Sequence, residues 1–219
     1  MSTITLDRVL PQPFTGIQGY SSSECGSDVW HRTIQFKRGV SYLVEARSGT
    51  GKSSLCSFIY GNRSDYLGRI LFDDTEARML GIDGWCDLRR SALSLLPQEM
   101  RLFPELTVME NVLLKNTLTD FRSEGEIRQL LKEMEMDSSY DTEAGYLSIG
   151  QQQRVALVRA LCQPFDFLIL DEPVSHLDAE NNRAAAIMVQ REAEAQGAGI
   201  IATSVGNPLM IPQYSLLQL

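Results

Sequence analysis

The stretch SYLVEARSGTGKSSLCSFIY, residues 41–60, constrains the fold of this chain more than any other part of the sequence. Its apolar beginning predicts a strand, and its end predicts a helix that starts near Lys52. The loop between them nearly matches the phosphate-loop pattern, which requires a glycine, four free positions and then Gly-Lys-Ser/Thr. Gly51, Lys52 and Ser53 fit this pattern, whereas Ala46 replaces its first glycine. A strand, a glycine-containing loop and a helix in this order predict an α/β fold that binds phosphate, rather than a simple turn before an ordinary helix.

The backbone amides of this loop can converge on phosphate oxygens, helped by the N-terminus of the helix that follows. Lys52 is predicted to bring a positive charge to the outer phosphates, and the hydroxyl of Ser53 is predicted to ligate Mg²⁺. The predicted nucleotide contacts in this loop are Ala46, Arg47, Ser48, Gly49, Thr50, Gly51, Lys52, Ser53 and Ser54.

The run LILDEP, residues 168–173, places two carboxylates directly after a continuous apolar segment. Such a segment is typical of a strand that is buried on both faces of a parallel sheet. The carboxyl end of such a strand lies beside the phosphate loop. We therefore predict that Asp171 holds Mg²⁺, directly or through water, and that Glu172 orients or deprotonates an attacking water. The alternative is an acidic turn before Pro173, which the upstream phosphate loop disfavours.

Two further strands are predicted near the end of the chain. A helical pattern ends at Gly197, and the apolar run AGIIATS, residues 198–204, predicts another buried strand. The final YSLLQL, residues 214–219, is a candidate for one more. Strands that alternate with helices on either side of a mainly helical middle region indicate an α/β core with a helical insert.

The segment LSIGQQQR, residues 147–154, identifies the family that the chain resembles. It is similar to the Leu-Ser-Gly-Gly-Gln signature of ATP-binding-cassette ATPases, and the surrounding motifs follow the order found in that family. A signature at a helix N-terminus presents unpaired N–H groups and the positive end of the dipole to an anion. In the family this end faces the ATP held by a second cassette. The resemblance therefore implies that Ser148, Gly150 and Gln151 contact ATP across a dimer, either a homodimer or a heterodimer.

The resemblance also implies the architecture. We expect a P-loop NTPase core with a mainly parallel sheet, an inserted helical subdomain that carries the signature, and an N-terminal antiparallel β region. The whole chain, residues 1–219, would form a single ATP-binding domain. Residues 1–98 and 163–219 would form the nucleotide-binding core, and residues 99–162 the helical subdomain.

Further functional residues follow from the same resemblance. Gln98 is similar to the family's glutamine that contacts Mg²⁺ and the attacking water. The loop SHLD, residues 175–178, is similar to the loop that communicates across the dimer. Residues 102–112 are similar to the surface that receives a permease, and we expect an exposed groove over residues 98–112. The apolar contacts expected in this groove are Phe103, Leu106 and Val108.

Four positions depart from the family pattern. Ala46 is compatible with the loop only if its φ is negative. Ile149 replaces the first glycine of the signature and limits backbone freedom there. Ser204 stands where the family has a catalytic histidine, so we expect it to act through a weaker hydrogen bond and turnover to be slow. The aromatic residue that stacks on adenine is predicted to be Tyr20, with Phe14 as the second candidate.

Composition narrows the range of partners. The formal net charge of −8 disfavours binding to nucleic acid or to an anionic membrane surface. The N-terminus shows no secretory signal and no apolar run reaches the length of a membrane span, so a membrane role would depend on an integral-membrane permease subunit. We expect a cytoplasmic location at the inner face of the cell membrane, with reduced cysteines.

The resemblance thus implies an ATP-hydrolysing subunit that uses ATP and Mg²⁺ as cofactors. The segment at residues 88–112 most resembles the branch of lipoprotein-release, macrolide-export and cell-division cassettes. Two alternatives are a cassette that senses nucleotide with little turnover and a soluble ATPase of the same family that does not serve transport.

Overall fold

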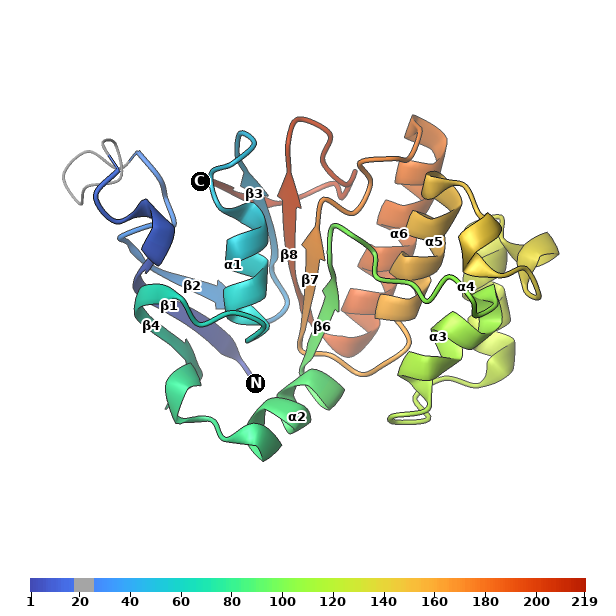
Figure 1. The fold of residues 1–219 in the computed structure, drawn as a ribbon, viewed down its shortest axis with the longest axis horizontal. Coiled ribbons are helices and arrows are strands. Elements are labelled where there is room, and N and C mark those ends of the chain that lie inside the picture. The colour runs from blue at the N-terminus through green and yellow to red at the C-terminus, as the bar shows by residue number, and fades with distance from the viewer. Residues whose placement is uncertain (18–25) are drawn as a thin grey trace.

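The computed structural model describes residues 1–17 and 26–219, and the described residues form two sheets with helices around them (Figure 1). The larger sheet is parallel throughout. In spatial order its strands are β6 (Leu93–Leu96), β7 (Phe167–Asp171), β8 (Gly199–Ser204), β3 (Ser41–Glu45) and β9 (Ser215–Gln218). Every residue of β7 and β8 is buried, which confirms the strands that the continuous apolar runs predict. The final segment also forms a strand, β9, at the edge of this sheet.

The smaller sheet is antiparallel and confirms the expected N-terminal β region. Its strands, in spatial order, are β2 (Thr33–Lys37), β1 (Thr3–Pro11), β4 (Tyr66–Phe72) and β5 (Thr75–Glu76). The short helical turn Gln12–Phe14 follows β1 directly and packs Phe14 against an apolar cluster that contains residues of both sheets.

Helix α1 (Lys52–Ile59) lies between the two sheets (Figure 1). Its buried residues Leu55, Phe58 and Ile59 belong to one apolar cluster with residues of β1, β3 and β7. This packing anchors the helix that follows the phosphate loop, and so holds the loop at the carboxyl end of β3. Helix α2 (Ile82–Ser91) precedes β6 at the rim of the molecule.

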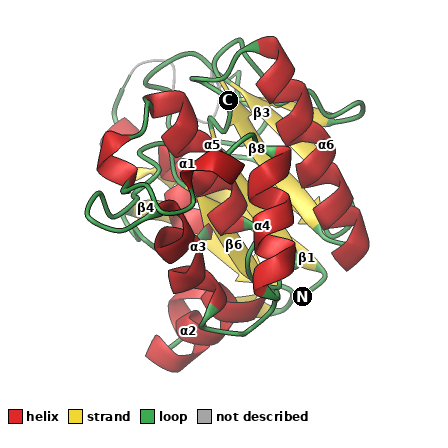
Figure 2. Cartoon of the chain, turned by 90° about the vertical axis from the view of Figure 1, so that its right-hand side faces the viewer, coloured by secondary structure: helices red, strands yellow, loops and turns green. Residues whose placement is uncertain are grey.

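Four helices lie on the opposite side of the parallel sheet (Figure 1 and Figure 2). They are α3 (Val108–Asn116), α4 (Glu124–Glu133), α5 (Ile149–Ala160) and α6 (Ala179–Gln196). Helices α5 and α6 lie next to the sheet, and α3 and α4 pack against them. In the described part of the chain α3, α4 and α5 each begin with a reciprocal capping box. The side chain of the residue before the helix and the side chain three residues later each accept a hydrogen bond from the other residue's backbone N–H. Helix α6 ends at Gly197, which adopts φ +60, as its position in the sequence predicts. No helix among the described residues combines the length and apolar character needed to cross a membrane.

One expectation for the helical region is wrong. Val108 was expected to be an exposed contact in the permease groove, but its side chain is completely buried. Val108 is the first residue of α3, and its side chain packs into the apolar cluster that also contains Leu130 and Val155. Phe103 is exposed and Leu106 is half-buried, so both remain at the surface.

Candidate active site

The loop between β3 and α1 has a backbone that depends on glycine. Gly49 and Gly51 adopt φ values of +82 and +100, a region that side chains rarely enter. A Cβ on Gly51 would lie 3.0 Å from Trp30 Cζ2 and 3.1 Å from Phe14 Cε2, so two aromatic rings press on the loop at this point. Ala46 is not among the described residues with positive φ, so its methyl group causes no backbone strain and the departure from glycine is tolerated.

The side chain of Lys52 lies inside the loop. Its Nζ donates a hydrogen bond to the carbonyl of Arg47 at 3.0 Å and lies 3.6 Å from Glu172 Oε1. The hydroxyl of Thr50 donates to the same carbonyl of Arg47 at 2.8 Å. The loop therefore surrounds an ammonium group, whose positive charge can attract an anionic ligand.

The hydroxyl of Ser53 donates a hydrogen bond to Gln98 Oε1 at 3.2 Å. Gln98 follows β6, while Glu172 follows β7, so the parallel sheet brings both side chains to the edge where α1 begins. Residues more than 40 positions apart in the sequence thus meet at the carboxyl ends of neighbouring strands.

These groups line one cavity of about 350 Å³, which we call the phosphate-loop cavity. Its lining is Pro11, Pro13, Phe14, Ser48, Gly49, Gly51, Lys52, Ser53, Ser54, Arg63, Gln98 and Glu172. Of the other predicted loop contacts, Arg47 and Thr50 hold the shape of the loop through their hydrogen bonds, and Ala46 joins the loop to β8 by donating its N–H to the carbonyl of Ser204.

Asp171, the last residue of β7, and Glu172, which follows it, are both bound by Thr203 on the neighbouring strand β8. Its hydroxyl donates to Asp171 Oδ1 at 2.7 Å and accepts the backbone N–H of Glu172 at 3.1 Å. Glu172 adopts φ +51, a strained conformation for a residue with a side chain. Backbone strain of this kind persists only where the surroundings hold it, and it is common at functional sites.

Gln153 of α5 connects the signature helix to this carboxylate loop. Its Nε2 donates to the carbonyl of Glu172 at 3.1 Å and to Ser175 Oγ at 3.2 Å, and its Oε1 accepts the N–H of His176 at 2.9 Å. Neither Thr203 nor Gln153 was predicted as a site residue. The sequence signals available were an amide in the run QQQR and a hydroxyl at the end of an apolar strand. Neither type of residue specifies a partner that lies 19 to 32 positions away.

The signature residues lie apart from the phosphate-loop cavity. Ser148 caps α5 through a reciprocal contact with Gln151, at 2.9 and 3.3 Å. A Cβ on Gly150 would lie 3.0 Å from the carbonyl of His176, so this position is close to the 175–178 loop. Ile149 is 55% exposed and points away from the core. None of these four residues, all within the described part of the chain, lines the cavity.

Ser204 and the two aromatic candidates have different positions relative to the cavity. Ser204 is 1% exposed, its Oγ has no hydrogen-bond partner among the described residues, and it does not line the cavity. Tyr20 lies outside the described residues. Phe14, the second candidate, lines the cavity and contacts the loop at Gly51.

A second cavity, of about 290 Å³, lies on the predicted permease side of the molecule. We call it the Phe103 groove, and its lining is Tyr60, Asn62, Leu95, Pro97, Arg101, Phe103, Leu114, Lys115, Arg159 and Ala160. Burial and the nearby Arg159 and Arg89 lower the pKa of the Lys115 ammonium, and burial also lowers the pKa of Arg159.

The fold and the loop define a phosphate-loop nucleotide-binding protein of the α/β class. The model of the family described as "ABC transporter" matches residues 32–175. The chain is 31% identical, over 76% of its own length and 75% of the relative's, to the lipoprotein-releasing system ATP-binding protein LolD of Syntrophotalea carbinolica. It is 28% identical to the ABC transporter ATP-binding protein YtrE of Bacillus subtilis, over 73% of this chain and 70% of YtrE. The chain therefore belongs to the ABC transporter family, as an ATP-binding cassette with ATPase activity.

A solved structure agrees with this fold. The dimeric structure of MJ0796, a bacterial ABC transporter cassette, superposes with a TM-score of 0.80 at 24% sequence identity. The match covers 98% of this chain and 94% of that one, so the similarity in fold includes both sheets and the helical region.

Proposed function

We propose that this cassette binds Mg-ATP in the phosphate-loop cavity, hydrolyses it slowly, and drives a separate integral-membrane permease. The observation that carries the proposal is the convergence of Lys52, Ser53, Gln98 and Glu172 on one cavity from three separate segments. Lys52 and the loop amides would bind the outer phosphates. Glu172 would orient or deprotonate the attacking water, and Gln98 would help to position that water.

The residues beside the cavity fit Mg²⁺. Ser53 Oγ and Gln98 Oε1 are 3.2 Å apart, and the carboxylate of Asp171 lies at the end of the next strand. The atoms that would ligate the ion are all oxygens, which Mg²⁺ prefers, and a bound nucleotide would supply further phosphate oxygens. We propose that Ser53, Gln98 and Asp171 hold the ion, which when bound neutralises charge on the phosphates.

The position of the signature supports a two-cassette arrangement. Ser148, Gly150 and Gln151 lie at an exposed helix N-terminus, away from the chain's own cavity. Such a terminus attracts an anion, and a second cassette would bring its own nucleotide there. We propose a dimer with two nucleotides between the subunits, formed with a second copy or with a related cassette. Ile149 would lie in this interface.

The Phe103 groove supports docking to a permease. It combines exposed apolar side chains, Phe103 and Leu114, with the cations Arg101, Lys115 and Arg159. No carboxylate is among the described residues that line it, although the chain as a whole is acidic. We propose that it receives a permease segment that carries both apolar and acidic side chains, which would hold the cassette at the cytoplasmic face of the membrane. The LolD relative supports a place in the lipoprotein-release branch.

The geometry around Ser204 favours one alternative, a cassette that senses nucleotide with little turnover. Ser204 is buried and does not line the cavity, so it offers no group to charge that develops on the terminal phosphate. Loss of one such contact commonly costs about 3–4 kcal/mol, or roughly 10²–10³ in rate. Glu172 does line the cavity, and this observation favours a cassette that hydrolyses ATP over this alternative.

Two substitutions test the proposal. Lys52→Ala removes the ammonium group inside the loop, so binding of ATP and its hydrolysis should both fall steeply. Glu172→Gln keeps the shape of the side chain but removes the base, so ATP should persist and the protein should elute as a dimer in size-exclusion chromatography with Mg-ATP. A Lys52→Ala protein with wild-type binding and turnover would show that the phosphate loop is not the site. A monomeric Glu172→Gln protein at high protein and ATP concentrations would contradict the homodimer and leave only a heterodimer.

A further inference from the structure

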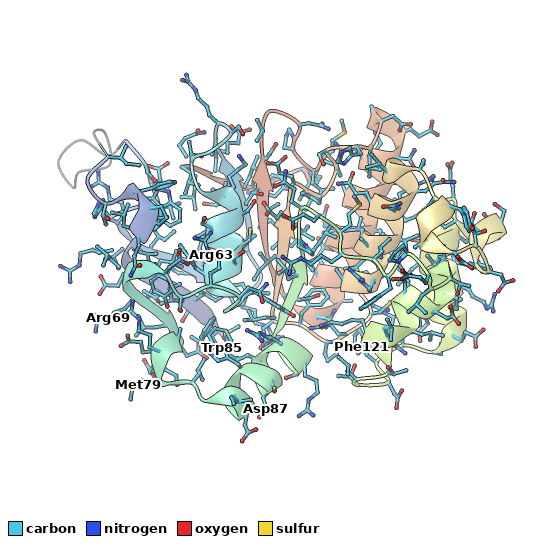
Figure 3. All side chains as sticks on the ribbon, in the orientation of Figure 1. Arg63, Arg69, Met79, Trp85, Asp87 and Phe121 are labelled. Carbon is cyan, nitrogen blue, oxygen red and sulfur yellow. The ribbon has the colours of Figure 1, made fainter. Side chains whose placement is uncertain are left out.

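The segment that follows α1 brings an arginine to the phosphate-loop cavity. Arg63 lines this cavity, and Figure 3 shows its side chain beside α1. Its Nη1 donates to Ser54 Oγ at 3.0 Å, although the backbone of Arg63 lies beyond the other end of the helix. The side chain therefore runs back along α1 toward the phosphate loop. It is the second cation, beside Lys52, among the described residues that line the cavity.

Contacts on two sides hold the guanidinium group. Asp65 Oδ1 accepts from Nε at 2.9 Å, and Asp65 Oδ2 accepts from Nη2 at 2.5 Å. The ring of Phe58 lies 5.3 Å from the guanidinium carbon. A guanidinium group has five N–H donors, and these contacts together with Ser54 use three of them, so two remain for a ligand in the cavity.

The position of Arg63 along the cavity differs from that of Lys52. Lys52 lies beside Glu172, at the end of the cavity that holds the catalytic groups. Arg63 contacts Ser54, and the carbonyl of its neighbour Asp65 accepts the N–H of Gln12, the first residue of the turn that carries Phe14. Arg63 therefore lies between the helix N-terminus and the aromatic end of the cavity, where the nucleoside part of a nucleotide would fit.

We propose that Arg63 binds the phosphate group nearest the ribose, the α-phosphate, and so contributes to nucleotide affinity independently of the terminal phosphate. This inference rests on the proposed function, because it places a nucleotide in the cavity. An arginine with two free donors suits a phosphate oxygen pair better than a lysine does. Since ATP and ADP share the α-phosphate, the contact strengthens the binding of both to the same degree. Arg63 would thus slow the release of ADP after hydrolysis.

The other role that these contacts allow is a structural one, in which Arg63 only ties the segment after α1 to Ser54. The two roles differ in what they require of Asp65. A structural tether relies on Asp65 to hold the guanidinium group against Ser54, so Asp65→Asn would weaken nucleotide binding as Arg63→Gln does. A phosphate contact needs only the guanidinium group, and Asp65→Asn would leave it with more uncompensated positive charge.

Binding of Mg-ATP and of Mg-ADP to the full chain, measured by isothermal titration calorimetry, tests the inference. Arg63→Gln should raise both dissociation constants by the same factor, about 5- to 20-fold for one charge-assisted contact at a partly exposed site. Asp65→Asn should bind both nucleotides at least as tightly as wild type does. The matched control is Arg69→Gln, because Arg69 pairs with Asp7 at 2.6 Å in a similar exposed ion pair but does not line the cavity. This control should bind both nucleotides like wild type.

Three results would overturn the inference. Arg63→Gln could bind both nucleotides within about twofold of wild type, or Asp65→Asn could lose as much affinity as Arg63→Gln. A loss confined to ATP would place Arg63 at the terminal phosphate instead. If the wild-type chain binds neither nucleotide, the proposed function fails together with the inference, whereas wild-type binding with an unaffected Arg63→Gln protein refutes the inference alone.

Discussion

Thr203→Val is the substitution that most directly tests how the fold positions Asp171 and Glu172, the proposed metal-binding and catalytic residues. Valine has nearly the shape of threonine, so the change removes a hydroxyl group from a site that is 1% exposed while it keeps the packing of β8. That hydroxyl donates to Asp171 at 2.7 Å and accepts the N–H of Glu172 at 3.1 Å. The variant therefore leaves a buried carboxylate short of one donor and a backbone N–H without its acceptor.

The size of the effect follows from these two hydrogen bonds. A bond to a charged group contributes about 1.5–3 kcal/mol, and an unsatisfied buried polar group costs about 1–3 kcal/mol. Since the added methyl group offsets part of this loss, the free energy of unfolding should fall by about 2–4 kcal/mol. For a chain of this size, that corresponds to a decrease of about 5–15 °C in melting temperature.

Differential scanning calorimetry and steady-state ATP hydrolysis are the two measurements. Turnover should fall by at least about tenfold, because Thr203 aligns both Asp171 and the peptide of Glu172. Thr203→Ser is the control, since it keeps the hydroxyl group and should retain most of the stability and the activity. A Thr203→Val protein that melts within about 2 °C of wild type and turns over at an equal rate would refute the reasoning.

Two further predictions concern the rate of hydrolysis and the cysteines. Wild-type turnover should be slow, and Ser204→His should raise it if the rest of the site is complete; steady-state hydrolysis in the presence of the permease measures this, and rapid wild-type hydrolysis would contradict the expectation. In alkylation by iodoacetamide near pH 8, followed by peptide mass spectrometry, Cys86 should react while Cys56 and Cys162 should not, because only the thiolate is nucleophilic. Cys86 is exposed, whereas burial raises the pKa of Cys56 well above its usual value and that of Cys162 to about 12. Modification of Cys56 in the folded protein would show that α1 is less well packed than the structure has it.

The local patterns of the sequence were sufficient for the α/β core, whereas the N-terminal antiparallel sheet was expected only from the family resemblance. The continuous apolar runs at residues 167–171 and 199–204 predicted strands buried on both faces, and the structure contains them as β7 and β8. The start of α5 at Ser148 and the end of α6 at Gly197 could be predicted as well. Apolar periodicity and helix caps depend on residues within a few positions of one another, so a single sequence records them directly.

Other features of the site required the tertiary structure. Arg63 reaches Ser54 only because the chain turns back after α1, and Gln153 reaches Glu172 only because α5 packs against the end of β7. Val108 was misjudged for a similar reason, since its place at the start of a helix does not reveal that this turn faces the core.

The sequence by itself determined the phosphate-loop motif, the two acidic residues at the end of the buried strand, and the family. Each of these features is a short run of residues, so the distances between its side chains are set by the local sequence. Only the tertiary structure decided which side chains assist them: Thr203 holds Asp171, Phe14 lines the cavity, and Ser204 lies outside it. The physical reason is that these contacts join segments 30 or more residues apart, where the packing of strands and helices, and not the local sequence, brings the side chains together.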